Sequence, residues 1–108
     1  MESIHDVILV LNDDKPVACG SFKEYEEGCA ELKRIFVCED FRREGLGKKV
    51  VNELEKKAIE KGYKRLILET GRVLLSAQKM YLRLGFKVID NYGQYKEMKD
   101  SVCMEKVL

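Results

Sequence analysis

Residues 31–58 read ELKRIFVCEDFRREGLGKKVVNELEKKA, and within this stretch the chain changes from a strand pattern to a helix pattern. Up to Val37, apolar and polar residues alternate, which is typical of a strand. From Leu46 the apolar residues recur at helical spacing along one face, and the opposite face is rich in lysine and glutamate. The two patterns meet in the basic, glycine-bearing turn FRREGLGKK, residues 41–49. The stretch therefore predicts a strand–turn–helix unit.

The same two patterns predict the rest of a mixed α/β sheet. The run 65–70 is apolar and follows the helix, so it predicts a buried parallel strand that completes a β-α-β crossover. Short turns at 12–15 and 26–28 join the earlier strands, which predicts an antiparallel arrangement. The length of 108 residues fits a single domain, residues 1–108. We expect about six strands, at 7–11, 17–25, 29–37, 65–70, 86–90 and 101–108, and two helices, at 46–62 and 76–85.

The strand at 29–37 is expected to present two different faces, because successive side chains of a strand point to opposite sides. This alternation separates Glu31 from the neighbouring Leu32. One face would carry Ala30, Leu32, Arg34 and Phe36, and the other would carry Glu31, Lys33, Ile35 and Val37.

Charge is distributed unevenly along the chain, although the formal net charge is only +1. Residues 1–31 carry two Lys or Arg and eight Asp or Glu, whereas residues 32–65 carry eleven and six. This contrast fits an ordinary solvated surface. It equally fits an anion site in the middle of the chain with an electronegative mouth beside it. The low total charge argues against non-specific binding to nucleic acid.

The four cysteines, at positions 19, 29, 38 and 103, form no C-x-x-C pair, and the sequence has a single histidine. This content argues against a zinc site. The longest apolar run, 7–11, is too short for a membrane span, and nothing marks a signal peptide. We therefore expect reduced cysteines in a cytoplasmic protein that binds neither metal nor membrane.

The turn at 41–49 can be compared with three anion-binding patterns. A Walker loop requires G-x-x-x-x-G-K-S/T, but Gly47-Lys48 is followed by Lys49, and Arg42 stands five positions before Gly47. A dinucleotide fingerprint requires a third glycine where the chain has Val50. The remaining pattern is a helix N-terminus, whose free N–H groups hold a pyrophosphate that glycines allow to come close. Taken alone, the stretch also fits a solvated helix start with a basic flank.

Two motifs together resemble the GNAT superfamily of N-acetyltransferases. The acetyl-CoA signature of that family, R/Q-x-x-G-x-G/A, is matched by residues 42–47, and a second motif, A-x-x-x-Y-x-x-x-G-F, is matched by residues 77–86. Both occur in the family's order and flank the predicted crossover. The resemblance implies a GNAT-like fold and an enzyme that moves an acetyl group directly from acetyl-CoA to a primary amine of a small molecule or peptide. The alternative is a non-catalytic acyl-CoA-binding module or sensor subunit.

The resemblance also implies where acetyl-CoA, the co-substrate, would lie. Its pyrophosphate would rest on backbone N–H groups of the turn, and Arg42 would support that turn. Its pantetheine arm would add like a strand beside residues 35–37, where a bulge would aim one N–H at the thioester carbonyl. The donor-binding residues implied in this way are Ile35, Phe36, Val37, Arg42, Arg43, Glu44, Gly45, Leu46, Gly47 and Lys48.

Two proton transfers of amine acetylation are assigned by the resemblance to Tyr81 and Glu31. Tyr81 would protonate the leaving thiolate, and the alternative is a core tyrosine on an amphipathic helix. Glu31 would take the proton of the amine, directly or through water, and the alternative is a surface or structural carboxylate. Glu69 is the second candidate base. Because the transfer is direct, Cys38 need not act as a nucleophile.

The chain departs from the family at its start. Relatives usually begin with a strand and two helices that wall the acceptor site, whereas this chain opens almost directly on the strand at 7–11. The acceptor side is then expected to be more open, or to be completed by the second subunit of a homodimer. Residues 91–101, with Tyr92 and Tyr95, are the candidate replacement for the wall. The acidic first third of the chain would favour a cationic acceptor.

Overall fold

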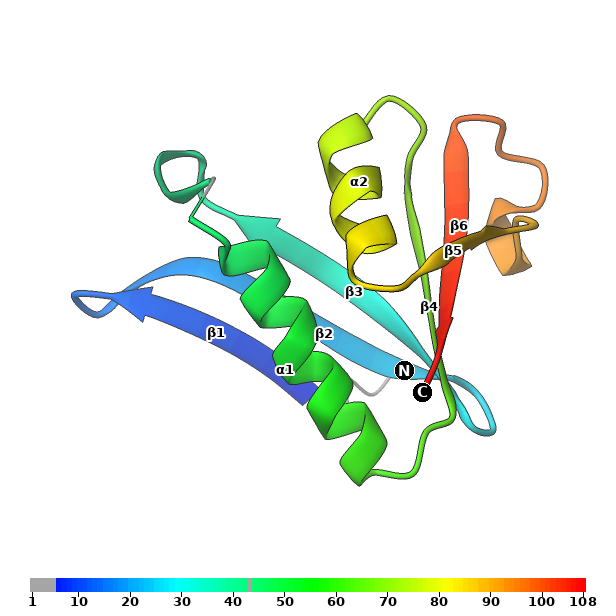
Figure 1. Ribbon diagram of the computed structural model, residues 1–108, viewed down its shortest axis with the longest axis horizontal. Helices are drawn as coiled ribbons and strands as arrows, with labels where there is room; N and C mark the ends of the chain where they lie inside the picture. Colours follow the sequence, from blue (N-terminus) through cyan, green and yellow to red (C-terminus); the bar gives the residue numbers. More distant parts are fainter. Residues whose placement is uncertain (1–5, 43) are drawn as a thin grey trace.

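A six-stranded mixed sheet with two helices makes up the computed structural model, which describes residues 6–42 and 44–108 (Figure 1). The elements are β1 (Asp6–Asn12), β2 (Lys15–Glu26), β3 (Cys29–Val37), α1 (Leu46–Glu60), β4 (Arg65–Gly71), α2 (Leu75–Arg83), β5 (Lys87–Ile89) and β6 (Ser101–Val107). The strand order in the sheet is β1-β2-β3-β4-β6-β5. β3 and β4 run parallel, and every other neighbouring pair is antiparallel.

Every helix and strand predicted from the sequence is present, and the ends differ by no more than two residues. The predicted mixed α/β architecture is therefore confirmed. Two short 3-10 turns, Glu39–Phe41 and Gly93–Tyr95, lie inside segments predicted as turn or loop. Within the described ranges, neither helix has the length and apolar character that crossing a membrane requires.

The hydrophobic core lies between the sheet and the helices. α1 lies across β1, β2 and β3 (Figure 1), and α2 joins the same cluster through Tyr81. Gly20 of β2 makes the close approach of α1 possible, because a Cβ at this position would lie 2.6 Å from both Ile35 Cδ1 and Val50 Cγ1. The fully buried face of α1 consists of Val50, Val51, Leu54 and Ala58.

β3 and β4 separate soon after they meet, and the gap between them positions the candidate site (Figure 1). Their parallel pairing comprises only Cys29 with Arg65, Ala30 with Leu66 and Glu31 with Ile67. Beyond Glu31, the edge of β3 that faces β4 pairs with no other strand in the part of the chain that the structure describes. Unpaired backbone groups on a strand edge are a template for an added extended chain.

A β-bulge in β3 corrects the predicted alternation of faces. The β2–β3 register passes from Ser21–Lys33 to Cys19–Phe36, so Arg34 and Ile35 together lie opposite one residue of β2. Arg34 has a φ of 57°, the left-handed conformation that some bulges adopt. The extra residue reverses the alternation, and Ile35 and Val37 pack against the core. Phe36 instead shares the helix-free face with Lys33, so the predicted grouping beyond Lys33 is wrong.

Candidate active site

The turn before α1 leaves backbone donors free. Gly45 precedes the helix with φ 77° and ψ 13°, a left-handed conformation that favours glycine. Its carbonyl accepts the Lys49 N–H at 3.1 Å. The N–H groups of Leu46, Gly47 and Lys48 have no partner among the residues that the structure describes. Because they lie at the positive end of the helix dipole, the turn offers an anion several unsatisfied donors.

Two contacts fix the position of this turn. The Arg42 Nε–H donates to the Val37 carbonyl at 3.2 Å, which ties the turn to the end of β3. A Cβ at Gly47 would lie 3.1 Å from Met80 Sδ, because the start of α1 packs closely against α2. The predicted supporting role of Arg42 therefore has a structural basis in this hydrogen bond.

The remaining motif residues lie on the outer surface. Glu44 and Lys48 are exposed, Leu46 is half-buried, and Arg43 lies outside the described residues. A hollow of about 380 Å³ runs along the flank of α1. Its lining is mixed in charge and consists of Gly45, Lys48, Lys49, Asn52, Glu53, Glu55 and Lys56. Positive side chains thus border the free N–H groups on the solvent side.

Tyr81 on α2 lies in the core, with 6% of its surface exposed. Its ring packs edge-on against Phe86, with the ring centroids 5.7 Å apart. Burial raises the pKa of Tyr81 to about 12. Its hydroxyl makes no hydrogen bond to a described residue. Near neutral pH this hydroxyl is therefore protonated.

Glu31 lies in a separate pocket on the helix-free face of the sheet. The pocket has a volume of about 410 Å³ and combines β2, β3 and the 3-10 turn Gly93–Tyr95. Tyr92 and Tyr95, expected as a wall, do line it. Tyr81 is not among the lining residues, so the structure does not bring Glu31 and Tyr81 together in this pocket. The lining consists of Ser21, Lys23, Tyr25, Glu31, Lys33, Arg34, Tyr92, Gly93, Gln94 and Tyr95.

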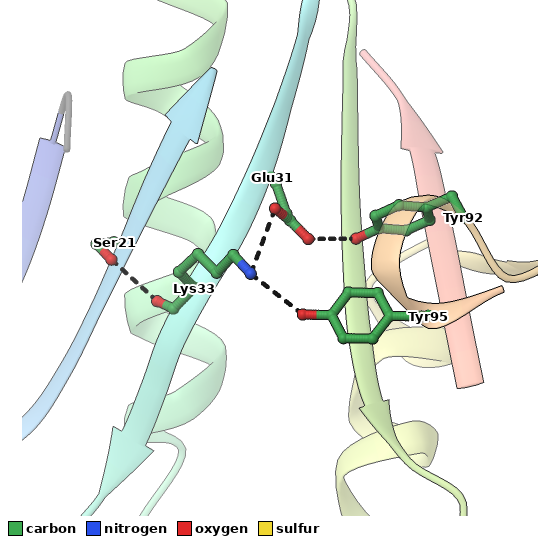
Figure 2. Close-up of polar contacts among 5 residues, drawn as sticks. All are labelled: Ser21, Glu31, Lys33, Tyr92 and Tyr95. Carbon is green, nitrogen blue, oxygen red and sulfur yellow. Dashed lines mark hydrogen bonds and ion pairs between the residues drawn. The ribbon is translucent and has the colours of Figure 1, made fainter. Parts of the chain in front are cut away.

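A hydrogen-bond network holds the Glu31 carboxylate in this pocket (Figure 2). The Tyr92 hydroxyl donates to Glu31 Oε2 at 2.7 Å, and Lys33 Nζ lies 3.4 Å from Oε1. Lys33 also donates to the Tyr95 hydroxyl oxygen at 3.2 Å. The Ser21 hydroxyl donates to the Lys33 carbonyl at 3.1 Å, which steadies the strand that carries both charged groups. Both carboxylate oxygens therefore already have partners.

The pKa shifts in this network define which groups carry protons. Burial, together with the adjacent Glu31 carboxylate, raises the pKa of Tyr92 well above its usual range. Burial alone would lower the pKa of Lys33, but the hydrogen bond to Tyr95 and the attraction of Glu31 outweigh it and raise the pKa. Tyr92 therefore stays a hydrogen-bond donor and Lys33 stays a cation across the neutral range.

The other two residues weighed for chemistry lie elsewhere. Glu69 is half-buried on β4 and accepts a hydrogen bond from the Ser101 hydroxyl at 2.7 Å, and it does not line the pocket of Glu31. Cys38 is a free thiol whose Sγ lies 3.7 Å from the Pro16 carbonyl oxygen. Of the two carboxylates, Glu31 thus lines the pocket and Glu69 does not.

The charges of the pocket contradict the expected electronegative mouth. One carboxylate, that of Glu31, faces three cations, those of Lys23, Lys33 and Arg34. Four other acidic residues of the first third, Asp13, Asp14, Glu26 and Glu27, lie in or directly beside the exposed hairpin turns at 13–14 and 27–28. Charge counted along the chain fails here because none of these four residues lines the pocket.

The sequence patterns assign no function to the three cationic residues of the pocket, Lys23, Lys33 and Arg34. Lys33 follows Glu31 by two positions in a strand, and this spacing alone indicates a shared face. Arg34 carries no comparable signal, because an alternating strand would turn it toward the core. The bulge brings it to the pocket instead.

Comparison with known proteins agrees with this architecture. The profile of the Acetyltransferase (GNAT) family matches residues 2–86, and the chain therefore belongs to the GNAT acetyltransferase family. It is 33% identical over 97 residues to the uncharacterized N-acetyltransferase YsnE of Bacillus subtilis, covering 88% of this chain and 64% of that protein. The chain thus spans less than two thirds of the length of this relative.

Solved structures share the fold over nearly the whole chain. A Klebsiella pneumoniae protein assigned to the acyl-CoA N-acyltransferases superposes with a TM-score of 0.89 at 32% identity, covering 94% of this chain and 71% of that one. The PaiA N-acetyltransferase of Thermoplasma acidophilum, solved in complex with coenzyme A, superposes with a TM-score of 0.81 at 25% identity, covering 95% of this chain and 62% of that one. The GNAT-like fold expected from the two motifs is confirmed.

Proposed function

We propose that the protein is an N-acetyltransferase that uses acetyl-CoA and moves the acetyl group directly to a primary amine. The observation that carries this proposal is the gap between β3 and β4. The gap is bordered by unpaired backbone of β3, starts beside the Glu31 pocket, and leads along β3 to the free N–H groups at the start of α1. An acetyl donor with an extended arm and a pyrophosphate matches this arrangement, because the arm would lie along the unpaired backbone of β3 and the pyrophosphate at the free N–H groups.

The residues present fit acetyl-CoA as the donor. The N–H groups of residues 46–48 would hold the pyrophosphate, and the exposed Lys48 would add positive charge. The backbone of Ile35, Phe36 and Val37 would bind the amide groups of the pantetheine arm as an added strand. The coenzyme A complex of the PaiA relative supports this assignment.

The proton transfers would be divided between the two sides of the gap. Bound acetyl-CoA supplies an acetyl thioester, whose carbon–sulfur bond breaks as a carbon–nitrogen bond forms. The protonated Tyr81 hydroxyl would give its proton to the leaving sulfur and regain one from solvent. A backbone N–H near Phe36 would donate to the carbonyl oxygen, where negative charge develops.

Glu31 would accept the proton that the amine releases, through an intervening water. Lys33 and Tyr92 already occupy both carboxylate oxygens, so a direct contact with the amine would have to displace one of them. A carboxylate oxygen has two lone pairs and accepts a water without that displacement. Glu69 remains the less favoured base because it lies outside the pocket.

Two measurements test this function. Isothermal titration with acetyl-CoA measures donor binding, and release of free thiol over a panel of primary amines measures turnover. We expect both. Binding without thiol release on any amine would support the alternative function, a non-catalytic acyl-CoA-binding module. No measurable binding would rule out both functions.

A matched pair of lysine substitutions tests the pyrophosphate site. Lys48→Gln should weaken acetyl-CoA binding about two- to fivefold, because a charge near the helix N-terminus is lost. Lys64→Gln removes the same charge from an exposed position beyond the other end of α1 and should leave the dissociation constant unchanged. Equal effects of the two substitutions would place the pyrophosphate elsewhere.

A single domain over residues 1–108, a cytoplasmic location and a homodimer remain predictions. Limited proteolysis tests the single domain, because one domain should resist cleavage between β3 and β4. Sedimentation equilibrium tests the homodimer.

A further inference from the structure

The pocket around Glu31 is built by specific contacts rather than left between loops. Gly93 has a φ of 53°, and a Cβ there would lie 3.1 Å from the Tyr25 hydroxyl oxygen. The rings of Tyr25 and Tyr92 pack edge-on with centroids 5.2 Å apart. The Asn91 side-chain amide donates to the carbonyls of Tyr95 and Met98 at 3.1 and 3.0 Å. These contacts hold residues 91–98 as a fixed wall over β2 and β3.

Arg34 is the pocket cation that has no partner among the residues described by the structure. Lys33 is bound by Glu31 and Tyr95, whereas the Arg34 guanidinium forms no hydrogen bond or ion pair with a described residue. Its φ of 57° costs about 1–2 kcal/mol for a residue with a side chain. A bulge of this kind re-aims a side chain, and here it adds a cation to a pocket that already holds more cations than carboxylates.

We propose that the acceptor is a free α-amino acid, with its carboxylate bound by Arg34 and its amino group directed toward Glu31. This assignment rests on the proposed function and names its substrate class. A guanidinium binds a carboxylate through two parallel hydrogen bonds, which fixes orientation as well as position. The carboxylate also offsets the positive charge of Lys23 and Lys33 in the lining.

The cationic lining favours the reactive form of such an acceptor. A neighbouring like charge disfavours an ammonium group, and the three cations of the lining oppose the stabilisation of that ammonium by Glu31, so the bound amino group can pass its proton on and become the nucleophile. A polyamine or a lysine side chain brings no anion and would be repelled by the same cations. The volume of about 410 Å³ is near the lower end of small-molecule pockets, roughly 300–1,000 Å³, and suits a single amino acid.

Pairs of amino acids and their carboxamides test the carboxylate requirement. L-leucine and L-leucinamide, or L-alanine and L-alaninamide, share the amino group and side chain and differ in the negative charge. We expect kcat/KM to be about ten- to a hundredfold higher for the acid, as for hydrogen bonds to charged groups. The amide has the more easily deprotonated amine, so a preference for the acid cannot come from reactivity. Equal or faster use of the amide would overturn the assignment.

Substitutions at Arg34 locate the origin of the preference. Arg34→Gln should reduce the ratio of acid to amide about tenfold, mainly through KM, and leave acetyl-CoA binding unchanged. Arg34→Gly should do the same, and glycine favours the native φ, so a folding defect would not explain the result. Arg34→Lys should keep part of the preference. Arg83→Gln on α2, an exposed site that does not line the pocket, should retain the full ratio. An unchanged ratio in Arg34→Gln would overturn the assignment.

A binding experiment separates this assignment from the proposed function. Titration of L-leucine and L-leucinamide in the presence of coenzyme A, which carries no acetyl group, requires no turnover. If no amine releases thiol but L-leucine binds more tightly in an Arg34-dependent way, the proposed function fails and the carboxylate site stands. If amines are acetylated while acid and amide bind equally, the proposed function stands and the carboxylate site is overturned.

Discussion

The Tyr92 hydroxyl donates to Oε2 of Glu31 at 2.7 Å, although 61 positions of sequence separate the two residues. This contact brings the loop before β6 onto the helix-free face of β3 (Figure 2). Glu31 is only 3% exposed, so its carboxylate depends on protein donors in place of water. The pair therefore couples the wall of the pocket to the candidate base.

Removal of this hydroxyl should destabilise the fold measurably. Tyr92→Phe leaves a buried carboxylate short of one donor, and we expect the free energy of unfolding in urea to fall by about 1–3 kcal/mol. Tyr63→Phe is the control, because the Tyr63 hydroxyl donates to an exposed carboxylate, that of Glu24, at 3.2 Å. The control should lose less than about 1 kcal/mol. Equal losses of unfolding free energy would show that the buried hydrogen bond to Glu31 contributes no more to stability than the exposed hydrogen bond to Glu24.

Loss of the Tyr81 hydroxyl should slow turnover without weakening donor binding. Tyr81→Phe retains the edge-on contact with Phe86 and removes the proton for the leaving sulfur. We expect kcat to fall about a hundredfold, the lower range for general acid catalysis, while the acetyl-CoA dissociation constant is unchanged. Full turnover in this variant would show that Tyr81 is a core residue only.

Stability should decline at alkaline pH because of the same hydroxyl. Tyrosine ionises near pH 10 in the unfolded chain, and burial raises the pKa of Tyr81 to about 12 in the folded one. The folded state holds the proton more tightly, so this contribution is complete below pH 10 and is lost as the pH rises toward 12. The loss is roughly 1.4 kcal/mol per pKa unit. In Tyr81→Phe, the free energy of unfolding in urea should decline less steeply over this pH range than in the unsubstituted protein. Parallel declines would contradict the raised pKa of Tyr81.

Addition of one methyl group at Gly20 should disturb the packing of α1. The new Cβ of Gly20→Ala would lie 2.6 Å from Ile35 Cδ1 and from Val50 Cγ1, so the helix has to shift. We expect a loss of about 1–3 kcal/mol in the free energy of unfolding. Gly71→Ala is the control, because its Cβ would meet only the half-exposed Leu74 side chain at 3.3 Å. A smaller effect at Gly20 than at Gly71 would contradict this packing.

The elements of the fold were predictable because their signals are local. Alternation marks the strands, helical spacing marks α1 and α2, and Gly45 and Gly62 stand at the two ends of α1. The family motifs likewise lie within short stretches. Tyr92 and Tyr95 were expected at the acceptor side, and they line the pocket.

The faces beyond Lys33 and the sign of the pocket's charge were not predictable in the same way. Arg34 adopts a positive φ although no glycine or asparagine marks it, because the bulge is set by pairing with β2. The charge count along the sequence predicted acidic residues around the site, but Glu31 is the one acidic residue among those that line the pocket. Both errors arise because the deciding contacts lie between separate segments of the chain, which local sequence patterns do not encode.

The short parallel pairing between β3 and β4 has a consequence for how the protein is maintained in a cell. Three residue pairs join the two halves of the sheet, so a donor that extends along the gap would serve as a missing strand as well as a substrate. A ligand that binds only the folded state stabilises it in proportion to the logarithm of its concentration above the dissociation constant. The abundance of folded protein would then follow the supply of acetyl-CoA, and starvation for the donor would hasten its turnover by proteases.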